Sequence, residues 1–176
     1  MINQQHVKFE ELAITNQSTN GFTNGFTNQN GHGLQLEGSE TTVDVLKCVV
    51  KECGYTGMNV RDGATVTATQ CEFMENGYGV SCADANTKVR LNECTMHHNG
   101  QYGLWAMSDA VVDLHGTKTG IHSNKMYGIV ASVRAKVNIH LPSQHNTSHD
   151  NVGDDRNQQT GGSIANINAD GTFTHT

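Results

Sequence analysis

Apolar and polar residues alternate along most of this chain, in short runs that return at a nearly constant interval. Within a run the apolar residues are two apart, as with Val43 and Val45, so one face of an extended strand is apolar. Turn-forming residues separate the runs, and the phrase Asn-Gly-Tyr-Gly-Val at 76–80 has close copies beginning at Asn99 and Asn124. The pattern predicts short strands joined by tight turns.

The interval between copies of the phrase predicts the architecture. Positions 30, 53, 76 and 99 are each 23 apart, and the next steps, to Asn124 and Asn151, are 25 and 27. A fixed period in this range is typical of a solenoid, whose repeats bury their apolar faces only by stacking on one another. We therefore predict an all-β fold, a single-stranded right-handed parallel β-helix of about six coils with roughly 23 residues per coil.

The alternation also predicts which residues point into the solenoid. The first strand of each coil contributes the pairs Leu34 and Leu36, Met58 and Val60, Val80 and Cys82, Leu104 and Ala106, and Ile129 and Ala131. The second strand contributes Val43 and Val45, Val66 and Ala68, Val89 and Leu91, Val112 and Leu114, and Val137 and Ile139. A third, shorter segment contributes Cys48 and Val50, Cys71 and Phe73, and Cys94 and Met96. Because neighbouring strands lie about 4.8 Å apart, equivalent side chains should stack in columns.

Two of these columns are predicted to be structural. The cysteines show no CxxC spacing, and Cys48, Cys71 and Cys94 are 23 apart, so we expect a column of buried free thiols and not disulfides or metal ligands. A second column contains the corner asparagines, with Cys53 as the one departure. Their backbone is expected to be left-handed and their amides to bond to the asparagines above and below. Its central members are Asn76, Asn99 and Asn124.

The regular repeats cover residues 33–151, within one domain overall. Residues 1–32 are expected to form an irregular N-terminal coil or cap, in which residues 7–14 favour a strand. Residues 141–162 fit either a long loop or a partial coil. Residues 152–176 are expected to hold one last strand, at 163–167, and a tail that covers the open end, since an exposed end coil invites association.

Charge and composition exclude several classes of partner. The formal net charge is -6 and no run of lysine or arginine occurs, so binding to nucleic acid or to anionic membranes is disfavoured. No apolar run is long enough to span a membrane, and the first 12 residues do not resemble a secretory signal. We expect a soluble protein, and the free cysteines suggest a reducing compartment. A removed signal, or a module of a longer protein, would leave the same sequence.

Each repeat resembles the parallel β-helix repeats of the pectate-lyase-like superfamily in the order of its parts. These are a strand, a turn, Val-x-Val or Val-x-Leu, Cys-x-Phe or Cys-x-Met, and Asn-Gly-x-Gly. The stretch at 138–148 is also similar to repeat proteins of marine algae and their large DNA viruses, which bring no established activity. The superfamily includes polysaccharide lyases, hydrolases, epimerases, tailspikes and adhesins, so the resemblance implies a fold and leaves the function open. The epimerase motif is missing, and of the galacturonan-hydrolase motifs only Gly31-His32-Gly33 and Asp154-Asp155 occur, in the wrong order.

Aromatic residues mark one candidate binding surface. Trp105, the only tryptophan, is predicted to point outward, next in its column to Ser81 and Val130. Exposed aromatic rings in a row suit stacking on sugar rings or on a partner protein. Alternatively, the tyrosines pack along the corner of the helix. The candidate ligand-binding residues are Trp105, Tyr102, Tyr127 and Tyr78.

A second face carries the candidate catalytic residues Arg90, Asp113 and His115, which the repeat places in two outward columns. A lyase or epimerase needs a cation to neutralise a uronate and a base to remove its C5 proton. The same residues also suit an ordinary solvated sheet face with a cross-strand ion pair between Arg90 and Asp113. The sequence shows no complete acid-base set.

Metal and cofactor sites are not expected from local motifs. Ten histidines are present, among them His115 and His140, but no short ligand motif joins them, and we interpret them as solvated turn residues. The acidic loop from Asp150 to Asp155 is the one candidate for Ca²⁺, although it lacks the alternating oxygen ligands of a known calcium loop.

Three hypotheses for function follow from these observations. The first is a non-catalytic β-helix module that binds glycan or protein on its flat outer face, centred on Trp105. The second is a polysaccharide lyase or uronan epimerase that acts on an anionic polysaccharide. The third is a structural spike or oligomerisation unit, which predicts end-to-end or side-by-side homo-oligomers.

Overall fold

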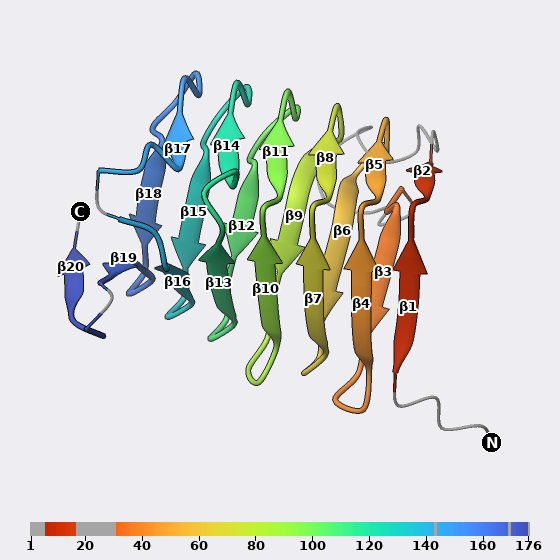
Figure 1. The fold of residues 1–176 in the computed structure, drawn as a ribbon, viewed down its shortest axis with the longest axis horizontal. Coiled ribbons are helices and arrows are strands. Elements are labelled where there is room, and N and C mark those ends of the chain that lie inside the picture. Colours follow the sequence, from red (N-terminus) through yellow and green to blue (C-terminus); the bar gives the residue numbers. More distant parts are fainter. Residues whose placement is uncertain (1–5, 17–30, 143, 169, 176) are drawn as a thin grey trace.

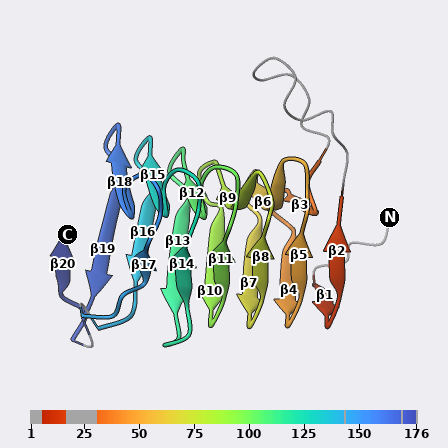
Figure 2. The same ribbon diagram turned by 90° about the horizontal axis from the view of Figure 1, so that it is seen from above.

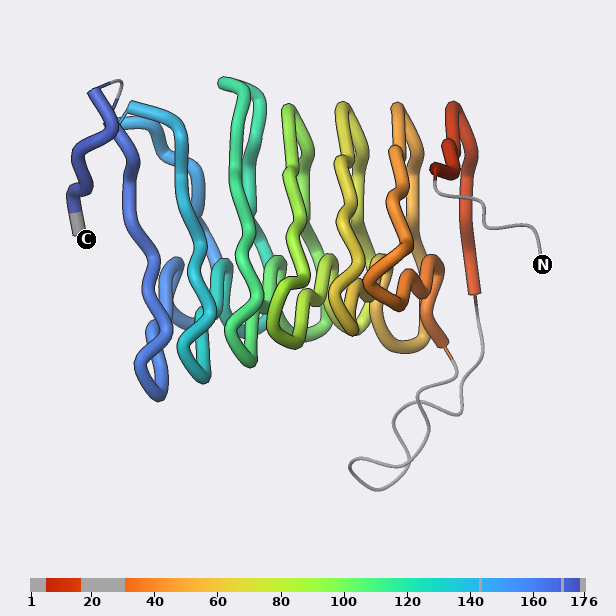
Figure 3. The backbone as a smooth tube through the Cα atoms, turned by 90° about the horizontal axis from the view of Figure 1, so that it is seen from below, coloured from red at the N-terminus to blue at the C-terminus, as the bar shows by residue number. Residues whose placement is uncertain are grey.

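The structure is a computed structural model that describes residues 6–16, 31–142, 144–168 and 170–175. Asn30, which begins the first copy of the repeat phrase, lies outside the described residues. The strands wind into one elongated solenoid with β1 near one end and β20 at the other (Figures 1 and 3). No helix in the described part of the chain could cross a membrane.

Three sheets run along the solenoid, and each coil contributes one strand to each sheet (Figure 1). The eight-stranded sheet, here the A sheet, is parallel except for its last pair. Its strands, in spatial order, are β1 (Val7–Glu10), β4 (Thr42–Leu46), β7 (Thr65–Thr69), β10 (Lys88–Asn92), β13 (Val111–His115), β16 (Lys136–Ile139), β19 (Ser163–Ile167) and β20 (Phe173–His175).

The other two sheets have six parallel strands each. The B sheet contains β2 (Ala13–Thr15), β5 (Val49–Lys51), β8 (Glu72–Met74), β11 (Thr95–His97), β14 (Gly120–His122) and β17 (Ser148–His149). The C sheet contains β3 (Leu34–Glu37), β6 (Thr56–Arg61), β9 (Tyr78–Cys82), β12 (Leu104–Ala106), β15 (Ile129–Ser132) and β18 (Arg156–Gln159), which lie together along one side of the solenoid in Figure 2.

This arrangement confirms the predicted all-β parallel solenoid of about six coils, with about 24 residues per coil. The register also follows the repeat, since Val43 pairs with Val66 and Val89 with Val112. Every residue predicted to point inward is buried, at no more than 8% exposed, in one continuous core. Cys48, Cys71 and Cys94 are among them, and all five cysteines are free.

The corner asparagines form a hydrogen-bonded ladder inside the solenoid. The backbone N–H of Asn76 donates to Oδ1 of Asn99 (3.1 Å), and that of Asn99 donates to Oδ1 of Asn124 (3.1 Å). The side-chain amide of Asn99 donates to Oδ1 of Asn124 (2.9 Å) and to the carbonyl of Phe73 (3.2 Å). Because these groups lie out of reach of water, each needs such a partner. The backbone N–H of Cys53 also donates to Oδ1 of Asn76, so Cys53 joins the ladder through its backbone although its side chain has no amide.

The backbone conformation predicted for these asparagines is wrong. The left-handed residue is the one before each asparagine: Glu75 (φ 55°), His98 (55°), Ser123 (56°) and Asp150 (56°). A single left-handed residue turns the chain at the end of each B-sheet strand from β5 to β17. The asparagine that follows then points inward, where its amide meets the carbonyl of the preceding coil.

The C-terminal part completes the solenoid. Residues 141–162, predicted to be a long loop or a partial coil, contain β17 and β18 and continue the B and C sheets. The last predicted strand is confirmed as β19. Beyond it, β20 pairs antiparallel with β19, with Ile167 opposite Phe173. The tail therefore covers the outer edge of the last A-sheet strand.

Candidate functional site

A row of aromatic rings runs along the corner that precedes the C sheet. It consists of five residues, one from each of five successive coils: His32, Tyr55, Tyr78, Tyr102 and Tyr127. Four of them directly precede a coil glycine, and Tyr55 lies one residue earlier, since Thr56 is the register partner of Tyr78. Neighbouring ring centroids lie 5.1 to 5.4 Å apart, and the first three pairs meet edge to face. Burial is the main cause that raises the pKa of Tyr78 to about 12.

Trp105 points outward from β12, between Ser81 and Val130 of the neighbouring strands, as the repeat predicts. Its ring stacks on Tyr78 of the preceding coil, with centroids 5.2 Å apart and planes at 26°. The ring of Tyr102 meets it edge-on at 5.6 Å. Tyr78 and Tyr102 therefore hold the indole of Trp105 in place and support the exposed surface that it forms.

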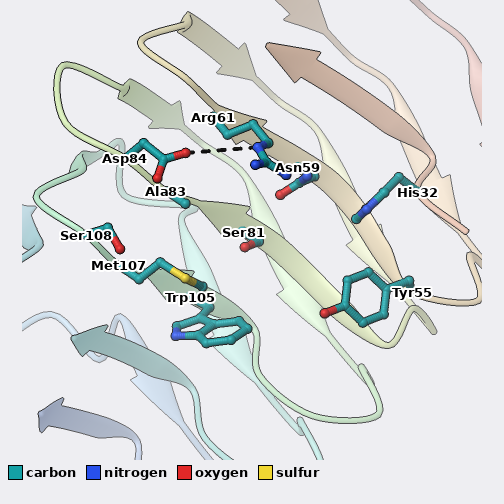
Figure 4. Close-up of a pocket in the computed structure, with 10 residues that line it drawn as sticks. All are labelled: His32, Tyr55, Asn59, Arg61, Ser81, Ala83, Asp84, Trp105, Met107 and Ser108. Carbon is teal, nitrogen blue, oxygen red and sulfur yellow. Dashed lines mark ion pairs between the residues drawn. The ribbon is translucent and has the colours of Figure 1, made fainter. Parts of the chain in front are cut away.

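A groove of about 280 Å³, here the aromatic groove, lies on the outer face of the C sheet next to these rings. Figure 4 shows it with His32 at one end and Trp105 at the other. Of the predicted ligand-binding residues only Trp105 lines it, and Tyr78, Tyr102 and Tyr127 lie outside its wall. Its lining comes from four coils and consists of His32, Tyr55, Asn59, Arg61, Ser81, Ala83, Asp84, Trp105, Met107 and Ser108.

The charged part of the aromatic groove is centred on Arg61. Its Nε lies 3.4 Å from a carboxylate oxygen of Asp62, 3.6 Å from Glu37 and 4.0 Å from Asp84. Nε is nevertheless buried and makes no hydrogen bond. Three carboxylates thus surround one guanidinium, so this end of the groove is negative overall.

His32 is the residue of this groove that sequence reasoning missed. It is only 8% exposed, and neither of its ring nitrogens has a hydrogen-bond partner. Burial lowers its pKa, so the ring is neutral at neutral pH. The Gly31-His32-Gly33 triplet matches one hydrolase motif, but its alignment with Gly77-Tyr78-Gly79 is the signal that places His32 in the aromatic row.

On the A sheet, Arg90 lies opposite Asp113, as the register predicts. The expected ion pair between them is absent. No guanidinium nitrogen of Arg90 lies within 4.0 Å of a carboxylate oxygen of Asp113, and both residues belong to the described part of the chain. Asp113 instead contacts the next coil: its Oδ1 lies 2.8 Å from Nε2 of His140 and accepts a hydrogen bond from Asn138 (3.0 Å). Burial, together with His140 and Arg90, lowers the pKa of His115.

The same contacts bring a second histidine to the predicted catalytic set. The rings of His115 and His140 stack with centroids 4.2 Å apart and planes at 8°. Asp113, His115 and His140 each offer a ligand atom, and these atoms all lie within 4.8 Å of one another. The repeat places His140 in the outward column of His115, but it does not predict the contact of His140 with Asp113, so the interpretation as a solvated turn residue missed this partner.

The acidic loop contributes to the asparagine ladder. Oδ1 of Asp155 accepts hydrogen bonds from the backbone N–H of Asn151 (3.2 Å) and from its side-chain amide (2.8 Å). Asp150 lies beside His149, with 2.8 Å between the carboxylate and Nδ1. The Ca²⁺ site expected in this loop stays a prediction.

Comparison with known proteins agrees with the architecture. A family model described as right handed beta helix region matches residues 3–174, nearly the whole chain. Searches of curated proteins and of solved structures found no match. With its three parallel sheets, its stacked core and this match, the chain belongs to the right-handed beta-helix family.

Proposed function

We propose that this protein is a non-catalytic β-helix module that binds a neutral glycan in the aromatic groove of the C sheet. The observation that carries the proposal is the combination of a supported aromatic wall at Trp105 with buried polar atoms of His32 and Arg61 that lack hydrogen bonds. A sugar offers its apolar ring face to Trp105 and its hydroxyl groups to the buried polar atoms of His32 and Arg61. The resemblance to the pectate-lyase-like superfamily, many of whose members act on polysaccharides, is consistent with such a ligand.

The buried atoms that make no hydrogen bond favour a ligand rich in hydroxyl groups. A buried donor or acceptor without a partner costs about 1–3 kcal/mol, which a polar occupant of the groove recovers. A neutral imidazole offers one donor and one acceptor, and a hydroxyl can serve either. Asn59 and Ser81, both on the groove wall and both at most 9% exposed, add an amide and a hydroxyl beside them.

The charge of the groove favours a neutral sugar over a uronate. Glu37, Asp62 and Asp84 already surround the only guanidinium of the groove wall, so a ligand carboxylate would meet net repulsion. The same carboxylates accept hydrogen bonds from sugar hydroxyls readily. This argument separates the proposed module from enzymes that act on anionic polysaccharides.

A glycan array of neutral and uronate oligosaccharides, followed by calorimetry on the best ligand, tests the proposal. Trp105→Ala should weaken binding about tenfold or more, because the stacking surface is lost. His32→Phe keeps a ring against Tyr55 and removes both nitrogens, so it should also weaken binding. Phe173→Ala, which removes an exposed aromatic ring on the A sheet, is the matched control and should bind as the parent does.

Two results would overturn the proposal. One is glycan binding that Trp105→Ala and His32→Phe both leave unchanged, since the ligand would then lie elsewhere. The other is the release of unsaturated uronate, detected by its ultraviolet absorbance, when the protein is incubated with an anionic polysaccharide. That product would show a lyase.

A further inference from the structure

Three side chains with metal-binding atoms converge on the outer face of the A sheet, away from the aromatic groove. Asp113 and His115 are two apart on β13 and therefore share one face of that strand. His140 follows β16, the neighbouring strand, whose register pairs Leu114 with Ile139. The stacking of coils thus brings His140 beside His115, although 25 residues separate them in the sequence.

The orientation of these groups supports a shared ligand. The ligand atoms of all three lie within 4.8 Å of one another, and Nε2 of His140 is 2.8 Å from Oδ1 of Asp113. Asn138 donates a hydrogen bond to the same carboxylate oxygen, which fixes its direction as the outer partners of metal ligands do. Among the described residues, this is the one cluster of three or more His, Cys, Asp or Glu side chains that could hold a metal ion.

We propose that Asp113, His115 and His140 form a binding site for a divalent transition-metal ion such as Zn²⁺. Two imidazoles and one carboxylate suit zinc or iron, whereas Ca²⁺ and Mg²⁺ prefer oxygen ligands alone. Three protein ligands leave at least one coordination position open, which is typical of a metal that binds water or a further ligand.

An adjoining groove gives that open position access to a small molecule. It has a volume of about 360 Å³, and Asn138 and His140 form part of its wall. Lys136, on the same face of β16, brings a cation to the groove, and Phe173 of β20 brings an exposed apolar ring. A small anion with an apolar body matches this lining, with its charged group toward the metal and Lys136.

Titration of the untagged full chain with Zn²⁺ by calorimetry, and with Co²⁺ by visible absorption, tests the site. We expect one ion per chain and a Co²⁺ spectrum that shows nitrogen and oxygen ligands. His115→Ala, His140→Ala and Asp113→Asn should each weaken binding by about tenfold or more, because each removes one of three ligands. Zn²⁺ should raise the melting temperature of the parent protein and not that of these variants.

His122→Ala is the matched control. His122 stacks on His97 and on His149 of the two neighbouring B-sheet strands, with centroids 5.1 Å apart in each case. Its ring does not belong to a group of three or more described ligand side chains whose ligand atoms converge as those of the proposed site do. The control should bind Zn²⁺ as tightly as the parent protein. Binding that is unchanged in His115→Ala and His140→Ala, or lost in His122→Ala, would overturn the proposal, and so would the absence of Zn²⁺ binding by the parent.

Discussion

Two columns of side chains run along the same coils only two or three residues apart, and they behave differently. The asparagine column is inside, where Asn76, Asn99 and Asn124 are at most 3% exposed and bond from coil to coil through amides and backbone N–H groups. The tyrosine column lies nearer the surface, where its rings contact one another and only Tyr78 is buried. Hydrogen bonds require short distances and fixed directions, whereas contacts between aromatic rings tolerate a wider range of geometries and partners. The inner column therefore stabilises the stack of coils, whereas the outer column supports the wall of the groove in which we propose that a glycan binds.

The largest expected effect comes from the glycine that follows Tyr78 and packs against the asparagine column. A Cβ at Gly79 would lie 2.5 Å from the carbonyl oxygen of Gly103 and 3.0 Å from Nδ2 of Asn99. Gly79→Ala must therefore displace the neighbouring coil, and we expect a loss of about 3 kcal/mol in the free energy of unfolding. Chemical denaturation measures it.

Gly100→Ala is the control for this substitution. It changes a glycine of the next copy of the repeat phrase, where the nearest atom to a new Cβ is 3.6 Å away. Its free energy of unfolding should stay within about 1 kcal/mol of the parent value. Equal losses in the two variants would mean that close approach of coils is not what this glycine provides.

Within the inner column, Asn99→Ala should cost about 2–3 kcal/mol. The substitution removes the acceptor of the Asn76 N–H and the donor to the Phe73 carbonyl, and it leaves both groups buried. Asn146→Ala changes an exposed loop asparagine and should alter stability by less than about 0.5 kcal/mol. If the two variants unfold at the same denaturant concentration, the ladder is not a source of stability.

The tyrosine column should make the free energy of unfolding depend on pH in the alkaline range. Burial, assisted by the neighbouring Tyr55 and Tyr102, raises the pKa of Tyr78 to about 12, above the value of about 10 for an unfolded chain. Between these values the unfolded state releases a proton that the folded state keeps, so stability falls as pH rises from about 10 to about 12. We expect a loss of about 2 kcal/mol over this range.

Unfolding at several alkaline pH values, with tyrosinate absorbance followed in parallel, checks this expectation. Tyr78→Phe lacks the ionising hydroxyl and should lose less stability over the same range. A tyrosinate titration without a late step in the parent protein would contradict the burial of this ring.

The smallest effect concerns the one cysteine in the inner column. The side-chain amide of Asn76 donates to the carbonyl of Val50, and Val50 pairs in register with Ile14 of the preceding coil. In Cys53→Asn the new amide is therefore placed to donate to the carbonyl of Ile14. We expect the free energy of unfolding to rise by about 0.5–1 kcal/mol. A fall would show that packing, and not hydrogen bonding, selects the residue at this corner.

The sequence by itself determined the coil, its period and its interior. Alternation assigned Val66 and Val89 to the core, and the spacing of 23 aligned Cys48, Cys71 and Cys94. Such assignments succeed because an inward residue has one requirement, burial, which its own position in the repeat satisfies.

Only the tertiary structure decided how the surface side chains combine. Asp113 faces Arg90 on one side and Asn138 on the other, and the fold directs its carboxylate toward Asn138 and His140. The aromatic groove likewise draws on four coils, so no single repeat contains its pattern. An outward side chain can turn toward either neighbouring coil, and that choice depends on rotamers and on residues more than 20 positions away, which a linear repeat does not specify.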